Sequence, residues 1–328
     1  MKLDVLDIRK SFGDKEILHG ISFSVVSGRA MGFLGRNGAG KSTTIRCLMD
    51  VFRQDSGQFL LDGQPFRPWE KRIGYLPEER GMYQKNDVLG QLVYFAMLRG
   101  ADRASALKTA HYWIDYFGLS DFKKKKLETL SKGNQQKIQI AQSFLNEPDI
   151  LILDEPFSGL DPLAQDQLLK VMTELKGKGA TILFSTHIME HAEKICERIL
   201  LMHKGREVLS GTMAEIKTRY GRNAVQLEFD GDAGFIKHLD FVASVSEYPR
   251  WVEVELKDGV DSDLLYAALA GRLSIRRFET VAPSLHKIFI TQIGGLAAGS
   301  GDGDVGGIPP AGDVSINSPT VEANNDQA

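Results

Sequence analysis

Cysteine is scarce in this chain. Only two of its 328 residues are cysteines, Cys47 and Cys196, and they stand far apart in the sequence. A disulfide framework or a paired-cysteine metal site needs more thiols at closer spacing, so both are excluded and a reducing compartment is expected. No apolar run approaches the ~18 residues that a membrane span needs. The first residues, 1–7, carry charges where a signal peptide would have an apolar core, so we expect a cytoplasmic protein.

The chain also lacks a strong excess of either charge. Lys and Arg together number 40, and Asp and Glu number 43, which gives a formal net charge of −3. This balance provides no basic field, and we expect no nucleic-acid partner. Hydrophobic residues make up 42% and charged residues 25%, as in ordinary folded proteins. The length predicts about two domains.

The last residues, 294–328, contain no Lys, no Arg and no aromatic residue. They hold eight Gly, three Pro and five acidic residues. Such a segment cannot bury enough apolar surface to offset its chain entropy. We therefore expect a disordered, acidic, glycine-rich tail over 293–328. Removing its five negative charges from the net −3 leaves about +2 on the rest.

Strand and helix patterns alternate over residues 1–220. The apolar runs at 30–34, 150–153 and 181–185 are short and continuous, which is typical of strands buried on both faces of a parallel sheet. Helical patterns lie between them, for example at 162–176. Residues 82–145 contain no strand candidate, so we expect a helical subdomain inserted into an α/β body.

A different order of elements is predicted over 223–292. Strand patterns occur at 224–230, 241–247, 251–256 and 273–279, and helical patterns at 232–239 and 261–270. The order βαββαβ is that of the split βαβ, or ferredoxin-like, arrangement. We expect a small α+β accessory domain here, with a boundary at 221–223.

The glycine-rich segment 35–43 carries the strongest motif. Its sequence, GRNGAGKST, fits G-x-x-x-x-G-K-[ST], follows a predicted strand and opens a predicted helix at 42–51. Glycines let consecutive N–H groups turn toward phosphate oxygens, and the helix N-terminus adds partial positive charge. Lys41 is expected to contact the β- and γ-phosphates of ATP, and Ser42 to ligate Mg²⁺. The predicted nucleotide-binding residues here are Gly35, Asn37, Gly38, Ala39, Gly40, Lys41, Ser42 and Thr43.

Two acidic residues follow the predicted strand at 150–153. Asp154 and Glu155 stand at its carboxyl end, where α/β sheets place their ligands. Asp154 is the expected Mg²⁺ partner. Glu155 is the expected general base that polarises the water attacking ATP.

Three further motifs complete an ordered set. They are LSKGNQQK at 130–137, SGLD at 158–161 and STH at 185–187. Together with the phosphate loop and the two acidic residues, they resemble the ATP-binding-cassette (ABC) family. The resemblance covers residues 1–220 and implies a P-loop NTPase cassette, an α/β fold that binds ATP and Mg²⁺.

Cassettes of that family dimerise head to tail, so the resemblance implies a homodimer or a pair with another cassette. Ser131 and Gly133 would contact the γ-phosphate of the ATP held by the partner's phosphate loop. Asp161 would lie at the dimer contact, and His187 would hydrogen-bond the γ-phosphate. The residues expected to serve catalysis are Lys41, Glu155 and His187.

The chain departs from the family pattern at three positions. Lys132 stands where Gly is usual, and Asn134 where Gln is usual. In the segment 74–81, the Gln that reaches Mg²⁺ and the water is replaced by Glu78. A carboxylate can face Mg²⁺, but it cannot donate a hydrogen bond unless it is protonated. Phe12 matches the aromatic residue that stacks on adenine, where the family more often has Tyr.

One branch of the family also has a Glu-containing loop and a segment like 282–290. It comprises ATPase subunits of bacterial exporters of the sodium-extrusion or multidrug type, which carry an accessory domain. The implied function is that of an ATPase that powers transport through a separate permease, peripherally on the inner face of the cell membrane. Two alternatives are a non-transport ABC ATPase acting on ribosomes or DNA, and a metabolite kinase that shares only the phosphate loop.

Overall fold

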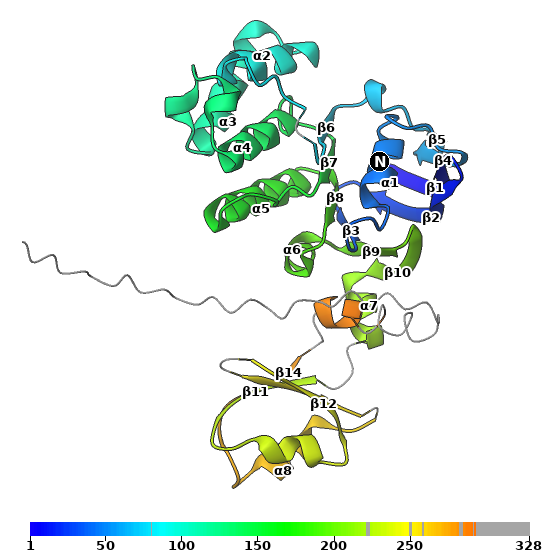
Figure 1. The fold of residues 1–328 in the computed structure, drawn as a ribbon, viewed down its shortest axis with the longest axis vertical. Coiled ribbons are helices and arrows are strands. Elements are labelled where there is room, and N and C mark those ends of the chain that lie inside the picture. The colour runs from blue at the N-terminus through cyan, green and yellow to red at the C-terminus, as the bar shows by residue number, and fades with distance from the viewer. Residues whose placement is uncertain are drawn as a thin grey trace, which may run out of the picture.

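A computed structural model describes residues 1–79, 81–220, 224–248, 251–257, 259–281, 285–290 and 292. The tail predicted for 293–328 and the boundary predicted at 221–223 lie outside these residues. The described chain forms three sheets with helices around and between them (Figure 1).

An antiparallel sheet with the order β2-β1-β4-β5 begins the chain. Its strands are β1 (Lys2–Phe12), β2 (Lys15–Val26), β4 (Ser56–Leu61) and β5 (Gln64–Pro65). The sequence patterns described above do not predict this sheet. The register between β1 and β2 shifts between Val5 and Ile8, so the buried positions do not keep the two-residue period of a regular strand.

A six-stranded sheet with the order β10-β9-β3-β8-β7-β6 forms the centre of the body. Neighbouring strands run parallel except β9 and β10, which are antiparallel. The strands are β3 (Ala30–Leu34), β6 (Ile73–Leu76), β7 (Ile150–Asp154), β8 (Thr181–Thr186), β9 (Arg198–His203) and β10 (Arg206–Thr212).

Helices and the first sheet cover both faces of this central sheet. Ala30 and Leu34 join one buried cluster with residues of α5 (Pro162–Gly177) and α6 (Met189–Ile195). Met31 and Phe33 join another, with residues of α1 (Lys41–Leu48) and the antiparallel sheet. All residues of β3, β7 and β8 are therefore buried, which confirms the strands predicted from the apolar runs. Two short helices, the 3₁₀ turn Pro68–Glu70 and α7 (Met213–Tyr220), complete the body.

Between β6 and β7 the described chain is helical. It forms α2 (Val88–Leu98), α3 (Arg103–Tyr116) and α4 (Lys132–Ser143), with 3₁₀ turns at Ser120–Phe122 and Leu127–Thr129. Asp87, Asp102 and Ser131 cap the three α-helices by accepting first-turn N–H groups. The three helices gather on one side of the body in Figure 1.

The C-terminal part is an α/β domain with its own antiparallel sheet, in the order β12-β13-β11-β14. Its elements are β11 (Ala224–Asp230), β12 (Val242–Glu247), β13 (Val252–Leu256), α8 (Ser262–Leu269) and β14 (Ser274–Val281). The short helix predicted at 232–239 is present only as a 3₁₀ helix, Gly234–His238, and not as an α-helix. The Asp232 side chain accepts the N–H of Gly234, a local turn that competes with an α-helix.

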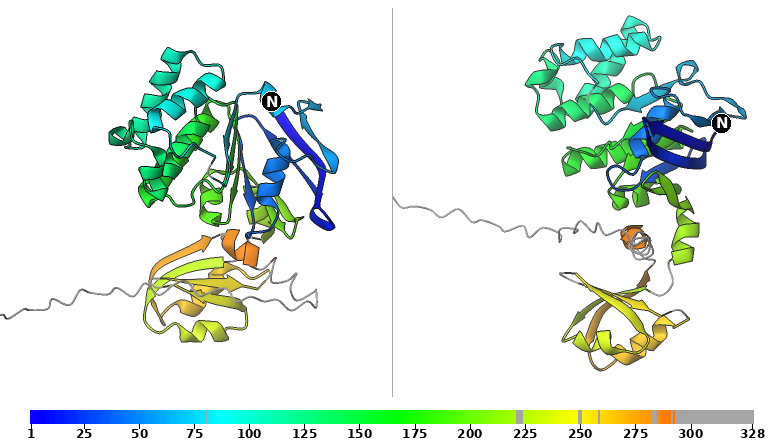
Figure 2. Two further views of the ribbon diagram at one scale, coloured as in Figure 1. Left: turned by 45° about the horizontal axis from the view of Figure 1, so that its top comes forward. Right: turned by 45° about the vertical axis from the view of Figure 1, so that its right-hand side comes forward.

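A helical segment at 285–290 connects this domain with the body, as Figure 2 shows. Leu285 and Ile288 are buried in the same cluster as Ile195 of α6. The N–H of Leu285 donates to Glu193 Oε1 of α6 at 2.9 Å. None of the helices among the described residues has the length and hydropathy of a membrane span.

Candidate functional site

The phosphate loop connects β3 to α1 and is closely packed on one side only. A Cβ atom at Gly35 would lie 2.4 Å from the Met202 carbonyl oxygen, and one at Gly40 would lie 2.8 Å from Leu18. Both glycines have positive φ, so other residues would be strained as well as crowded. Asn37 and Gly38, by contrast, are exposed. The loop is thus fixed against β9 and β2 while its outer side stays accessible.

The start of α1 supplies unpaired donors next to this loop. Among the described residues no side chain caps α1, and the N–H groups of its first turn, at Lys41, Ser42 and Thr43, have no helical acceptor. The N–H of Ala39 is instead used locally, because it donates to the Arg36 carbonyl at 3.1 Å. Unpaired donors at a positive helix end form a site for an anion such as phosphate.

Lys41 is the cation of this cradle. Its side chain is only 5% exposed, and its Nζ donates to the Gly35 carbonyl oxygen at 2.7 Å. The same Nζ lies 3.3 Å from Glu155 Oε1. The ammonium group is thus held at the edge of the phosphate loop, next to the carboxylate predicted to act as base.

Asp154 is the last residue of β7 and is 1% exposed. Burial raises the pKa of this carboxyl, the hydrogen bond from Ser185 and the nearby Ser42 hydroxyl oppose the rise, and the charges of Glu78 and Glu155 add to it. Asp154 Oδ2 is buried and has no hydrogen-bond partner among the described residues. A bound cation would satisfy this oxygen and favour the ionised carboxylate.

Glu155 follows Asp154 in a left-handed backbone conformation with φ of 48°. Its N–H donates to Ser185 Oγ at 2.8 Å, and its Oε2 lies 3.0 Å from Nδ1 of His187. His187 comes directly after β8 and is 54% exposed. The glutamate is therefore placed between a buried lysine and an accessible histidine.

Glu78 follows β6, and its Oε2 accepts a hydrogen bond from Ser42 Oγ at 3.1 Å. Among the residues with described placement, no three His, Cys, Asp or Glu side chains form a ready-made metal cage. Mg²⁺ commonly binds through one or two carboxylates together with substrate phosphates. The donors Ser42, Glu78 and Asp154 beside a phosphate cradle suit that mode of binding.

Ser131 and Gly133 belong to a different group of contacts. Ser131 Oγ caps α4 by accepting the Asn134 N–H at 3.3 Å. A Cβ on Gly133 would lie 3.0 Å from the Gly159 carbonyl oxygen, and Lys137 of α4 pairs with Asp161 at 3.0 Å. Within the described part of the chain, no hydrogen bond or ion pair joins Ser131 or Gly133 to the phosphate loop.

Phe12 lies at the end of β1 and is 45% exposed. Its ring meets Phe52 edge-on at 5.1 Å, and Lys10 Nζ lies 5.2 Å from the ring centre. The Phe12 ring is therefore partly open to solvent, as stacking on a planar ligand requires.

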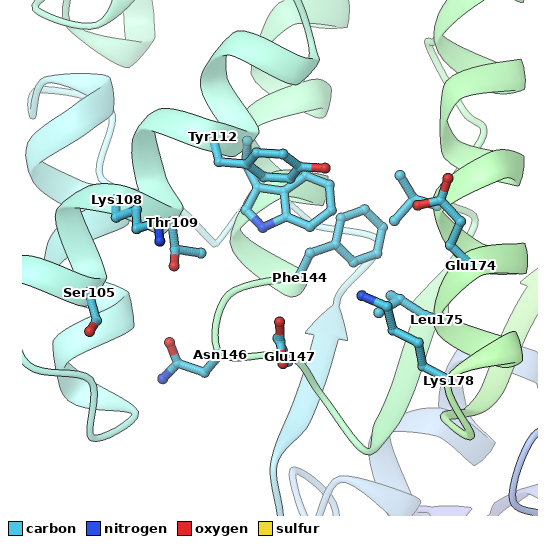
Figure 3. A pocket seen from close by; sticks show the side chains of 12 residues that line it. Ser105, Lys108, Thr109, Tyr112, Phe144, Asn146, Glu147, Glu174, Leu175 and Lys178 are labelled. Atoms are coloured by element: carbon cyan, nitrogen blue, oxygen red, sulfur yellow. The ribbon is translucent and has the colours of Figure 1, made fainter.

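A pocket of about 490 Å³ lies elsewhere, between α3 and α5 (Figure 3). Its lining includes Tyr112, Trp113, Phe144 and Lys178, and none of the predicted site residues. The candidate nucleotide site is thus an accessible edge of the central sheet rather than this pocket.

One residue at this edge is not predicted from the sequence. Ser185 belongs to the STH motif, and its hydroxyl contacts both Asp154 and Glu155. Only the pairing of β7 with β8, which aligns Asp154 with Ser185, reveals this role.

Family models match two parts of the chain. A model of ABC transporters matches residues 18–158, and a model of the C-terminal domain of DrrA1-3-like ATP-binding proteins matches residues 211–293. An uncharacterised ABC transporter ATP-binding protein of Bacillus subtilis is 39% identical over 295 residues, which is 90% of this chain and 99% of the relative. The chain belongs to the ABC transporter ATP-binding proteins. It is the ATP-binding subunit of an ABC transporter and an ATPase.

Two further comparisons agree with this membership. A Nod factor export ATP-binding protein of Rhizobium is 30% identical to this ABC subunit over 301 residues, covering 89% of this chain and 97% of the relative. The solved structure of an ATP-binding subunit of an ABC transporter is 33% identical and has a TM-score of 0.63. The similarity covers 67% of this chain and 93% of that one. Because the chain belongs to this family, the alternative interpretation as a metabolite kinase is wrong.

Proposed function

We propose that two copies of this ABC ATPase close on two ATP molecules, and that hydrolysis reopens them to power export through a separate permease. The carrying observation is the position of Glu155, whose carboxylate oxygens lie 3.3 Å from Lys41 and 3.0 Å from His187. These residues come from three separate elements at one edge of the central sheet. This arrangement of a lysine, a glutamate and a histidine suits hydrolysis of the phosphoanhydride bond of ATP more than nucleotide binding alone.

Each side chain has a distinct role in this proposal. Lys41 and the open N–H groups of α1 bind the terminal phosphates, and Phe12 stacks on the adenine. Glu155 accepts the proton of the attacking water. His187 donates a hydrogen bond to the γ-phosphate and keeps the glutamate oriented. The residues assigned to ATP in this way are Phe12, Gly35, Asn37, Gly38, Ala39, Gly40, Lys41, Ser42 and Thr43.

Ser42, Glu78 and Asp154 would hold Mg²⁺. When bound, the ion neutralises phosphate charge as the bond to the leaving group breaks. The orphaned Asp154 Oδ2 supports this assignment, because a buried carboxylate oxygen without a partner is costly.

The separation of two site halves supports the dimer. The start of α4 offers Ser131 and Gly133 at an exposed helix end, with no described contact to the phosphate loop of the same chain. A second subunit placed head to tail would bring these groups to the ATP bound by the first. A homodimer satisfies this arrangement, and so does a pair with a related cassette.

The direction of transport rests on the Nod factor export relative, which is 30% identical over 89% of the chain. We extend the proposal to a peripheral position on the inner membrane face, through the permease. The strand order β12-β13-β11-β14 supports a ferredoxin-like assignment for the accessory domain. We place the cassette at 1–220, its helical subdomain at 82–145 and the accessory domain at 223–292.

The variant Glu155→Gln tests the hydrolytic proposal. It keeps the size of the side chain and removes the base, so we expect ATPase activity to fall by about 100-fold or more. ATP, but not ADP, should then hold the variant as a dimer during gel filtration. The exposed Glu174→Gln of α5 is the matched control and should remain active. Normal hydrolysis by Glu155→Gln would contradict the proposal.

A further inference from the structure

Ser185 stands in β8 directly opposite Asp154 of β7, in the parallel register of the two strands. Its side chain is completely buried. We propose that Ser185 is a positioning residue for ATP hydrolysis, because its hydroxyl fixes the turn that aims Glu155 into the site. The inference rests on the proposed role of Glu155 as the general base.

The Ser185 hydroxyl uses both its donor and its acceptor capacity. It donates to Asp154 Oδ1 at 2.5 Å and accepts the N–H of Glu155 at 2.8 Å. A hydroxyl has a single proton to donate, so each hydrogen bond here has a fixed donor. The Glu155 amide donates to Ser185, and Ser185 donates to the Asp154 carboxylate. One buried group thereby links the two acidic residues of the site.

The backbone conformation of Glu155 is one that needs a stabilising hydrogen bond. Its φ of 48° lies in the left-handed region, a backbone conformation that residues other than glycine adopt rarely. A conformation of this kind persists where the surroundings hold it in place. The N–H of Glu155 bonds to Ser185 across the sheet, so Ser185 is the strand neighbour that secures the turn.

His187, which directly follows β8, makes a second contact with Glu155. This residue follows Ser185 by two positions, and its Nδ1 lies 3.0 Å from Glu155 Oε2. Ser185 thus fixes the main chain of the glutamate, and His187 fixes its carboxylate. Because Ser185 is fully buried, it acts through its two neighbours and does not meet the nucleotide.

Replacing Ser185 by Ala removes the acceptor of the Glu155 N–H. The turn then has fewer restraints, and the carboxylate spends less time in the productive orientation. We expect kcat to fall about 10- to 100-fold, with KM for ATP changed by less than about threefold, since misplacement of a catalytic group acts mainly on the chemical step. The phosphate loop and Phe12 make no described contact with Ser185, so ATP binding should be preserved.

The test compares steady-state ATPase kinetics of full-length variants that pass a thermal-melting check. Ser143→Ala is the matched control, because Ser143 is also fully buried but donates to the Ile140 carbonyl near the end of α4. It should keep wild-type kcat. Ser185→Thr retains the hydroxyl and should restore kcat to within about threefold of wild type. Where its methyl group prevents folding, Ser185→Cys serves instead and should give an intermediate kcat.

A double variant separates positioning from general destabilisation. In the Glu155→Gln background, adding Ser185→Ala should not lower the residual ATPase rate further, because the carboxylate that Ser185 positions is already absent. A loss as large as in the wild-type background would overturn the proposal, and so would a wild-type kcat in Ser185→Ala. If Glu155→Gln itself hydrolyses ATP normally, the proposed base is wrong. If Glu155→Gln is inactive while Ser185→Ala is normal, only the role of Ser185 is wrong.

Discussion

The hydroxyl of Ser42 donates a hydrogen bond to Glu78 Oε2 at 3.1 Å. Ser42 belongs to the first turn of α1, and Glu78 is the second residue after the end of β6. The contact therefore joins the phosphate cradle to the connection with the helical part of the body. It also places a carboxylate next to the hydroxyl expected to bind Mg²⁺.

The first prediction concerns the charge of Glu78. Glu78→Gln keeps the side-chain size and removes one negative charge beside Ser42 and Asp154. We expect the Mg²⁺ concentration for half-maximal ATPase activity to rise about fivefold, as the loss of about 1 kcal/mol of partly screened attraction implies. Maximal activity should stay within a few-fold, because the carbonyl oxygen of a glutamine can still face the ion.

Glu79→Gln is the control for that measurement. Glu79 is 86% exposed and pairs with Arg46 at 3.2 Å, and no hydrogen bond joins it to Ser42 among the described residues. The Mg²⁺ dependence of this variant should match the wild type. An unchanged Mg²⁺ requirement in Glu78→Gln would show that Glu78 takes no part in holding the ion.

The second prediction concerns the exposed ring of Phe12. Phe12→Ala should raise KM for ATP about three- to tenfold with little change in kcat, because aromatic stacking contributes about 0.5–1.5 kcal/mol beyond burial. Phe12→Tyr should behave like the wild type, since stacking needs only the ring. Trp69→Ala is a control at an aromatic residue that is 69% exposed. Equal KM values for Phe12→Ala and the wild type would remove Phe12 from the adenine site.

The third prediction concerns the ion pairs between the 285–290 segment and β13. Lys287 Nζ lies 2.8 Å from Glu253 Oε1 and 3.2 Å from Glu255 Oε2, and the Glu253 side chain is only 7% exposed. Lys287→Ala leaves this carboxylate without its cation, and we expect a loss of about 1–3 kcal/mol in the free energy of unfolding of the C-terminal domain. The measurement is thermal or urea unfolding of the full chain. Lys237→Ala removes an exposed pair with Glu247 and should change stability by less than about 0.5 kcal/mol.

The same pairs give that stability a pH dependence with a definite sign. Burial lowers the pKa of Lys287, but the bonds to Glu253 and Glu255 outweigh it, so the pKa lies above its ordinary value of 10.5. A raised pKa contributes stability below pH 10.5 that is lost as the pH rises through the folded value. The difference between wild type and Lys287→Ala should therefore shrink in strongly alkaline solution. A difference that stays constant there would mean that packing, rather than charge, causes the effect.

Parts of this fold can be predicted from the sequence because a single physical constraint dominates them. β3, β7 and β8 are buried on both faces, so unbroken apolar runs mark them. β1 and β2 carry bulges that interrupt the two-residue period, and they were missed. The segment 232–239 has a helical pattern, but the Asp232 turn limits it to a 3₁₀ helix.

The site likewise has residues that the sequence predicts and one that it does not. Lys41, Asp154, Glu155 and His187 lie in motifs whose spacing is visible in the sequence, and the structure brings these four residues to one edge. The contact between Ser185 and Asp154 joins residues 31 positions apart through strand pairing. A serine within a strand has no sequence signal of its own, so this contact becomes visible only in the fold.

The 285–290 segment has a consequence for how the protein is made. Leu285 and Ile288 complete a buried cluster whose other members include Ile195 and Ile216, so part of the cassette interior is supplied by residues that follow β14 in the chain. A ribosome makes the receiving surface first and then all of 224–281 before the covering residues emerge. During that interval the nascent cassette presents an uncovered apolar surface, and a chain released before residue 285 would keep it.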